Sequence, residues 1–377
     1  MSDTSPLPAE IVEQLVARWG GEEGSAALIN KGTNAVFGFR AGANDLILRI
    51  HHTGDRTRKE TEAEVNWVDF LHRHGVKVGW PVASIDGQWV ETLEWEGKDL
   101  IATVYQKMPG RHPQLSIDKK WRTRLIRNIG RTLGRMHALN RSYEPPEGLD
   151  RFDWSQIDLP RFAEGIAPAE ETAYLENLRA HWRWVQSLPR DDPESFGLVH
   201  GDFHAANLLA KGSKVAVIDF DGVCYNWYLF DIAHFIGNSI LTLGPLKTEE
   251  RQERARILFQ EFMRGYVKEN RMRSDWFEFF PSFLRGFQLL YYFNLLANFQ
   301  SNKEQREKAP HYKLVRKNVL NDLPLVELDF RKLYKEVERS KFMQWVIKHV
   351  IIPSRTNSTA GNSHEGAGGD QNRTSAS

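Results

Sequence analysis

One stretch decides how this chain folds: His200-Gly-Asp-Phe-His-Ala-Ala-Asn207, followed by Val215-Ala-Val-Ile-Asp219. Asp202 and Asn207 lie five positions apart between apolar segments, and Asp219 comes at the end of an apolar run. Such a run predicts a strand, whose end presents the carboxylate at a loop, where functional groups concentrate. Carboxylate and amide oxygens are the ligands that Mg²⁺ prefers. The stretch therefore predicts a polar site carried on the loops of a small β-rich region.

The order of these residues indicates a reaction. Phosphoryl transfer requires a group that orients and deprotonates the attacking hydroxyl, oxygen ligands for Mg²⁺ and positive charge at the nucleotide phosphates. The spacing from Asp202 to Asn207 matches the kinase catalytic loop, and Asp219-Phe220 resembles the metal-binding Asp-Phe-Gly of kinases. Capping of a turn would explain any one of these residues but not the ordered set. Together they predict an ATP- and Mg²⁺-dependent phosphotransferase.

Two histidines, His200 and His204, flank Asp202 in the same loop. Their spacing would also suit a zinc pair, but zinc sites take three or four protein ligands and no third ligand is evident in the sequence. We therefore interpret both histidines as groups that orient the loop.

The same stretch, with Val217-Ile-Asp-Phe-Asp221, resembles the signature of the aminoglycoside phosphotransferase and choline kinase-like superfamily, including its homoserine kinase type II and stress-response kinase A-like branch. The resemblance implies an α+β, bilobal protein kinase-like fold with a small antiparallel-sheet N-lobe and a mainly helical C-lobe. It also implies that Asp202 is the catalytic base and that Asn207 and Asp219 ligate Mg²⁺.

Two further matches to this family lie outside the central stretch. Asp231, in Tyr228-Leu-Phe-Asp-Ile-Ala233, stands where the family has an acid that braces the catalytic loop. His137, in Leu133-Gly-Arg-Met-His-Ala-Leu139, belongs to a matching helix, where the family histidine is structural rather than catalytic.

A kinase-like fold also needs a cation on its third strand and a helix glutamate to hold it. The predicted cation is Arg49, within the apolar run 46–50, where the family often has Lys. Arginine is always charged and can hold phosphate oxygens with two parallel N–H bonds. Glu64 falls at the position of the helix glutamate, and Glu60 is the alternative one turn earlier.

The rest of the nucleotide site is predicted from the resemblance alone. The turn Lys31-Gly-Thr-Asn34 is similar to the family's Gly-x-x-Asn turn, in which Gly32 would let the backbone approach the phosphates and Asn34 would add a hydrogen bond. Adenine is expected at the lobe junction, against backbone groups of residues 105–108, including Gln106 and Met108.

The pattern around the central stretch favours two lobes. Strand-like runs lie at 26–30, 35–40, 45–50, 81–85, 88–93 and 100–105, with a helical period over 58–74. Beyond Met108-Pro-Gly110, long amphipathic helices are predicted at 118–140, 169–186, 248–268 and 274–298. We predict an N-lobe at 1–105, a hinge at 106–110 and a C-lobe at 111–350. The tail at 351–377 is rich in Ser, Thr, Asn and Gly, which predicts disorder.

Composition excludes several classes of partner. The chain of 377 residues has a net charge of +1, so no global field points to nucleic acid or an anionic membrane.

The chain has a single cysteine, Cys224, which suits a reducing compartment. Residues 1–10 lack the basic start and apolar core of a secretory signal. The apolar region 277–299 is interrupted by charged residues and a proline, which favours a buried helix over a membrane span. We expect a cytoplasmic protein.

The acceptor is open at this point. The resemblance suggests a hydroxyl of a small molecule, such as homoserine, an amino alcohol, a sugar or an aminoglycoside. The alternative is a protein Ser/Thr kinase of the stress-response kinase A type. A third possibility, an inactive nucleotide-binding scaffold, has no need of Asp202, Asn207 and Asp219 together. The sequence indicates no oligomeric state.

Overall fold

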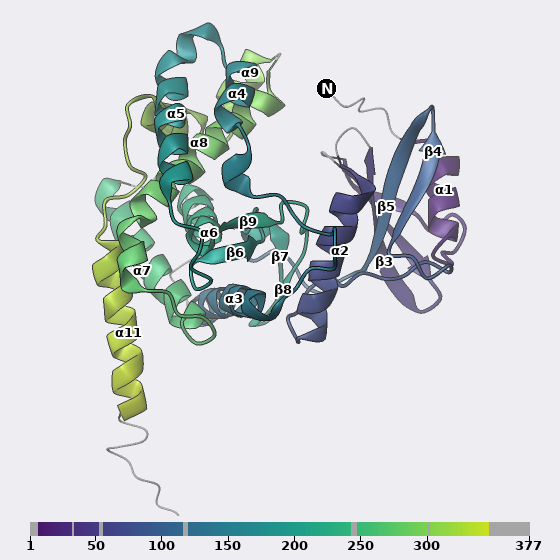
Figure 1. Cartoon of the computed structure of the whole chain (residues 1–377), viewed down its shortest axis with the longest axis horizontal. Helices are drawn as coiled ribbons and strands as arrows, with labels where there is room; N and C mark the ends of the chain where they lie inside the picture. Colours follow the sequence, from purple (N-terminus) through teal and green to yellow (C-terminus); the bar gives the residue numbers. More distant parts are fainter. Residues whose placement is uncertain are drawn as a thin grey trace, which may run out of the picture. The chain divides into compact units, whose positions relative to one another are not determined.

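The computed structural model describes residues 7–31, 34–52, 56–115, 120–242, 247–300 and 302–346 (Figure 1). The chain divides into two units, Met1–Glu338 and Arg339–Ser377. The first unit holds the sheets and the helices up to the first part of α11. The predicted disordered tail, 351–377, lies outside the described residues.

The N-terminal sheet, as far as it is described, has five antiparallel strands in the order β1-β2-β3-β5-β4. Their bounds are β1 Ala27–Lys31, β2 Ala35–Ala41, β3 Asn44–His52, β4 Val90–Trp95 and β5 Lys98–Gln106. Successive side chains of a strand point to opposite faces. Leu46, Leu48 and Ile50 of β3 pack in one core with helix α1, Ala9–Ala17. Arg49 and His51 are therefore buried on the other face of the same strand.

Helix α2, Arg58–Arg73, brings a carboxylate to that second face. The helix begins with a capping box, in which Thr57 and Glu60 satisfy each other's backbone N–H groups. Val65, Val68 and Leu71 form the buried side of α2, and Glu64 is buried with them. The predicted helix and its buried face are thus confirmed.

Residues 81–85 do not form the strand that their apolar character predicts. Pro81 makes an isolated bridge with Tyr105, and the chain then turns back, with Ser84 N donating to Gln88 O at 2.7 Å. Proline cannot donate to a sheet ladder, which favours such a short bridge over a full strand.

The C-terminal lobe is mainly helical, as predicted, with two small antiparallel sheets, β6-β9 and β7-β8, among the described residues. Its strands are β6 Phe196–Val199, β7 Leu208–Lys211, β8 Lys214–Val217 and β9 Cys224–Trp227. Its described α-helices are α3 Lys120–Leu139, α4 Leu159–Glu164, α5 Thr172–Ser187, α6 Tyr228–Thr242, α7 Thr248–Tyr266, α8 Phe280–Asn298, α9 Lys303–Lys308, α10 Tyr312–Leu320 and α11 Phe330–Val346. One large apolar core joins these helices, α9 excepted, to the inner face of α2 and to β6 and β8.

The apolar region 277–299 is buried in this core. Phe283, Leu284 and Phe287 of α8 are each at most 5 % exposed. Over the described parts of the chain, no helix is long and apolar enough to cross a membrane.

Candidate active site

A tight backbone turn starts the predicted catalytic loop, which connects β6 to β7. Gly201 has φ +82°, and a Cβ atom there would lie 1.9 Å from the carbonyl oxygen of Gly222. Only glycine fits this conformation and this close approach. The turn therefore brings residues 200–207 against the loop that follows β8.

Asp231 holds this turn from the first turn of α6. Its Oδ2 accepts from the backbone N–H of His200 at 2.8 Å, and its Oδ1 accepts from that of Gly201 at 2.9 Å. His137 of α3 lies with Nε2 3.3 Å from Asp231 Oδ2 and Nδ1 2.9 Å from the Tyr266 hydroxyl. Burial lowers the pKa of His137, although the hydrogen bond to Asp231 opposes this shift. His137 is thus a neutral bridge between helices.

The His200 side chain joins the two loops. Its Nε2 lies 3.1 Å from the carbonyl oxygen of Ile218, and its Nδ1 accepts from the backbone N–H of Asp202 at 3.3 Å. Ile218 N in turn donates to the carbonyl oxygen of Asn207 at 3.0 Å. The two loops are therefore fixed to each other by backbone as well as side-chain contacts.

The Asp202 carboxylate is surrounded by hydrogen-bond donors. His204 Nε2 lies 3.2 Å from Oδ2, His234 Nε2 lies 3.1 Å from Oδ1, and Asn207 Nδ2 donates to Oδ2 at 2.9 Å. Burial would raise the pKa of Asp202, but the hydrogen bonds from His204 and His234 outweigh it and hold the pKa well below its usual range. The side chain is 46 % exposed, so this ionised carboxylate can be reached from solvent.

Asp219 lies on the loop after β8. It has φ +63°, a left-handed conformation that is uncommon for residues other than glycine. Such outliers concentrate at functional sites. The Asp219 side chain is 51 % exposed, and its Oδ1 lies 3.9 Å from Arg49 Nη1.

Arg49 and Glu64 form a buried ion pair on the second face of the sheet. Arg49 Nη2 donates to both carboxylate oxygens of Glu64, at 2.7 and 2.8 Å, and to the Tyr105 hydroxyl at 2.9 Å. Burial would lower the pKa of Arg49, but Glu64 and Tyr105 raise it well above its ordinary value. Glu60, the alternative partner, caps α2 instead.

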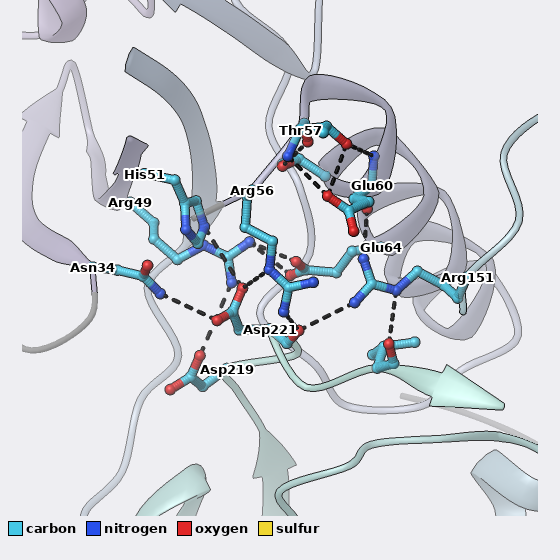
Figure 2. Close-up of polar contacts among 12 residues, drawn as sticks. Asn34, Arg49, His51, Arg56, Thr57, Glu60, Glu64, Arg151, Asp219 and Asp221 are labelled. Atoms are coloured by element: carbon cyan, nitrogen blue, oxygen red, sulfur yellow. Dashed lines mark hydrogen bonds and ion pairs between the residues drawn. The ribbon is translucent and has the colours of Figure 1, made fainter. Parts of the chain in front are cut away.

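A second acid on the loop after β8, Asp221, lies among cations (Figure 2). Arg56 Nε lies 3.3 Å and His51 Nε2 3.7 Å from its Oδ1, and Asn34 Nδ2 donates to its Oδ2 at 3.4 Å. Burial would raise the pKa of Asp221, but the charges of Arg49 and Arg56 lower it to about 2. Burial, together with the charge of Arg49, lowers the pKa of His51 to about 3.

Arg151 ties this loop to the start of α2, as Figure 2 also shows. Its guanidinium donates to the carbonyl oxygens of Val223 at 2.7 Å, Glu60 at 2.8 Å and Asp221 at 3.3 Å. The loop that carries Asp219 and Asp221 is thereby held to both lobes.

A family model described as "Phosphotransferase enzyme family" matches residues 25–266 of this chain. The chain belongs to the phosphotransferase enzyme family. The match confirms the family resemblance of residues 200–221 and the prediction of a phosphotransferase.

Similar proteins cover most of this phosphotransferase. Amicoumacin kinase of Bacillus subtilis (strain 168) is 26 % identical over 326 residues, which are 86 % of this chain and 95 % of the relative. A solved amicoumacin kinase in complex with AMP-PNP, Ca²⁺ and Ami has a TM-score of 0.78 at 24 % identity, over 87 % of this chain and 97 % of its own. A microcompartment-associated aminopropanol kinase has a TM-score of 0.66 at 23 % identity, over 86 % and 100 %. These likenesses confirm the predicted fold.

The other residues of the phosphotransferase that were predicted to bind the nucleotide have further contacts in the structure or lie outside its described part. The Gln106 N–H donates to Trp80 O at 2.9 Å and its side chain to Asp45 O at 3.1 Å, so its donors are already used inside the fold. Met108 is half-buried next to Gly79. Asn34 is directed at Asp221. Gly32 lies outside the described residues.

Several residues at the site were not expected from the sequence. His234 lies three positions after Asp231 on α6, a spacing that places both on one side of a helix and could have identified it. Asp221 falls within the matched signature but had no expected role. Arg56 and Arg151 reach the site only through the fold, because each lies many positions from the loop that it contacts.

Proposed function

We propose that this phosphotransferase transfers the γ-phosphate of ATP to a hydroxyl group of a small molecule, with Asp202 as the catalytic base. The observation that carries the proposal is an ionised, solvent-accessible carboxylate held between His204, His234 and Asn207. Such a carboxylate accepts a hydrogen bond from the hydroxyl group of the small molecule and orients the hydroxyl oxygen for attack on the γ-phosphate.

We further propose that Asn207 and Asp219 hold Mg²⁺, Asn207 through Oδ1 and Asp219 through its carboxylate. Mg²⁺ usually takes one or two carboxylates together with substrate phosphates and waters, which fits a half-exposed Asp219. Held by Asn207 and Asp219, Mg²⁺ would neutralise negative charge on the nucleotide phosphates.

Residues of both lobes would then take part in the reaction. Arg49, fixed by Glu64, presents its charge to the nucleotide phosphates from the N-lobe, 1–105, which residues 106–110 join to the C-lobe, 111–350. Asp202 receives the hydroxyl proton as the new O–P bond forms and the bond to ADP breaks. Because its pKa lies below the usual range, Asp202 stays ionised and can accept the hydrogen bond of the attacking hydroxyl.

A small-molecule acceptor is supported by the relatives. The relative matched over 95 % of its length is named for an antibiotic, amicoumacin, and a structural relative is named for aminopropanol. Both names denote kinases that act on small molecules, so we infer the same class of acceptor. We also propose a cytoplasmic location, where ATP is available and the buried free thiol of Cys224 stays reduced.

The test is a turnover assay with Mg²⁺-ATP and a panel of acceptors. The panel would hold amino alcohols, homoserine, choline, sugars, aminoglycosides and amicoumacin, with casein and myelin basic protein as protein acceptors. We expect ADP release that depends on a small molecule, and a product heavier by one phosphate in the mass spectrum. Phosphate found only on protein would contradict the proposal and favour a protein kinase.

A further inference from the structure

A pocket lies in the C-terminal lobe, lined by the short helix η3, Ala169–Glu171, and by α9 and α10. Its volume is about 570 Å³, within the range of small-molecule sites. Its charged lining includes Arg306, Glu171, Arg316, Lys303, Lys313 and Lys317. None of its lining residues belongs to the loops of the candidate active site, and Figure 1 shows α9 well separated from β7 and β8.

Arg306 is a buried cation at this pocket. Arg306 is 4 % exposed, and its Nε has no hydrogen-bond partner among the residues that the structure describes. Within the described part of the chain, no carboxylate forms an ion pair with it. Arginine stays charged in proteins, and a buried charge without a partner is costly. A side chain kept in this state points to an anion that the pocket receives from outside.

The face of α10 that lines the pocket carries more positive charge. Lys313 and Lys317 lie four positions apart, where like charges repel and destabilise a helix. Both are exposed, whereas Arg316 between them is paired with Glu171. Counting the whole lining, five basic side chains stand against three acidic ones. The pocket is therefore cationic, although the chain as a whole is close to neutral.

Glu171 is already partnered inside the fold. Its Oε1 accepts from Arg316 Nε at 2.9 Å, and the buried Tyr292 hydroxyl lies within reach of the same carboxylate. The charge of Arg316 is thereby compensated, whereas that of Arg306 has no carboxylate partner among the described residues.

We propose that this pocket binds a small anion that carries a phosphate or carboxylate group. Arg306 anchors the anionic group, because its planar guanidinium holds such groups with parallel hydrogen bonds. Lys313 and Lys317 add charge at the exposed side. The lining includes no residue of the loops that carry Asp202 and Asp219.

The experiment measures thermal unfolding and calorimetric binding of the full chain with sodium phosphate or citrate at constant ionic strength. We expect at least one of the two anions to raise the unfolding temperature of the parent. In Arg306→Met this gain should disappear, with affinity lower by about tenfold or more. Without an anion, the variant should be as stable as the parent or more stable, because it no longer buries an unpaired charge.

Three further variants locate the anion. Lys313→Gln with Lys317→Gln, which changes exposed residues only, should weaken binding and reduce its dependence on salt. Lys268→Gln, an exposed lysine outside the pocket, should change neither. Arg49→Met should keep the gain.

The proposal would be overturned if the anion still raised the unfolding temperature of Arg306→Met, or if it no longer raised that of Arg49→Met. It would also be overturned if the parent bound neither anion. The phosphate and citrate arms tell a phosphate ligand from a carboxylate ligand. None of these results depends on turnover, so they are independent of the proposed function.

Discussion

At the scale of residues, two carboxylates of the candidate site, Glu64 and Asp202, lie in different surroundings. Glu64 is 2 % exposed and pairs with Arg49, whereas the side chain of Asp202 is 46 % exposed among histidines. A buried ion pair stabilises little in comparison with apolar residues of similar volume, but removing one partner strands the other charge. The pair is therefore best explained by a need to hold the Arg49 guanidinium in one position.

Arg49→Met should destabilise the protein by about 3–5 kcal/mol, because Glu64 would remain buried without its cation. The double variant Arg49→Met, Glu64→Leu should recover most of that stability in urea unfolding. Turnover should remain lost in both, because neither presents a cation to the phosphates. If the double variant also recovered turnover, Arg49 would be a structural residue and not a phosphate-binding one.

At the scale of elements, the turn between β6 and η4, Ala205–Asn207, sets the distance between the two functional loops. Gly201→Ala would force a Cβ against the carbonyl oxygen of Gly222 and should push the loops apart. We expect turnover to fall by about two orders of magnitude or more, in line with misplaced catalytic groups.

Gly212→Ala is the matched control for that substitution. Gly212 also has a left-handed φ, +64°, but a Cβ there would meet nothing within 4 Å. Its expected cost is about 1 kcal/mol of backbone strain with unchanged turnover. Both variants carry the strain of a left-handed backbone, which urea unfolding measures. Only Gly201→Ala also adds a contact with Gly222, so only this variant should lose turnover. Equal losses of turnover in the two variants would contradict the role given to Gly201.

The elements also show how far the sequence predicts this fold. The bounds of amphipathic helices such as α3 and α7 can be predicted to within a few residues, because their apolar residues recur with the period of a helix. Helix α6 was missed because it is apolar nearly all round, with Leu229, Ile232 and Phe235 all buried. The signature predicted Asp202 and Asp219 as site candidates, but contacts such as Arg151 to Asp221, 70 positions apart, follow only from the fold.

At the scale of the whole molecule, buried histidines should make stability depend on pH. Burial lowers the pKa of His51 to about 3 and that of His181 to about 4, whereas an unfolded histidine titrates near 6.5. As pH falls through 6.5 the unfolded chain takes up protons that the folded chain does not, so folding becomes less favourable. The pKa values of Asp202 and Asp221 are lowered in the folded chain, so their protonation reduces the free energy of unfolding further only below about pH 4.

We therefore expect the free energy of unfolding to fall steadily from pH 7 to pH 4.5. His181→Gln should flatten this dependence, which urea unfolding at several pH values measures. A free energy that is constant or rises toward pH 5 would contradict the neutral, buried state of these histidines.

The central claim concerns the whole active site: Asp202 acts in the chemical step, while other residues hold the nucleotide. Asp202→Asn keeps the size of the side chain and removes its charge. The most direct measurement compares Mg²⁺-ATP affinity with acceptor-dependent turnover in this variant and the parent. We predict affinity within about threefold and turnover lower by about 10²–10⁴-fold, as for loss of a general base. Turnover equal to that of the parent would contradict the claim.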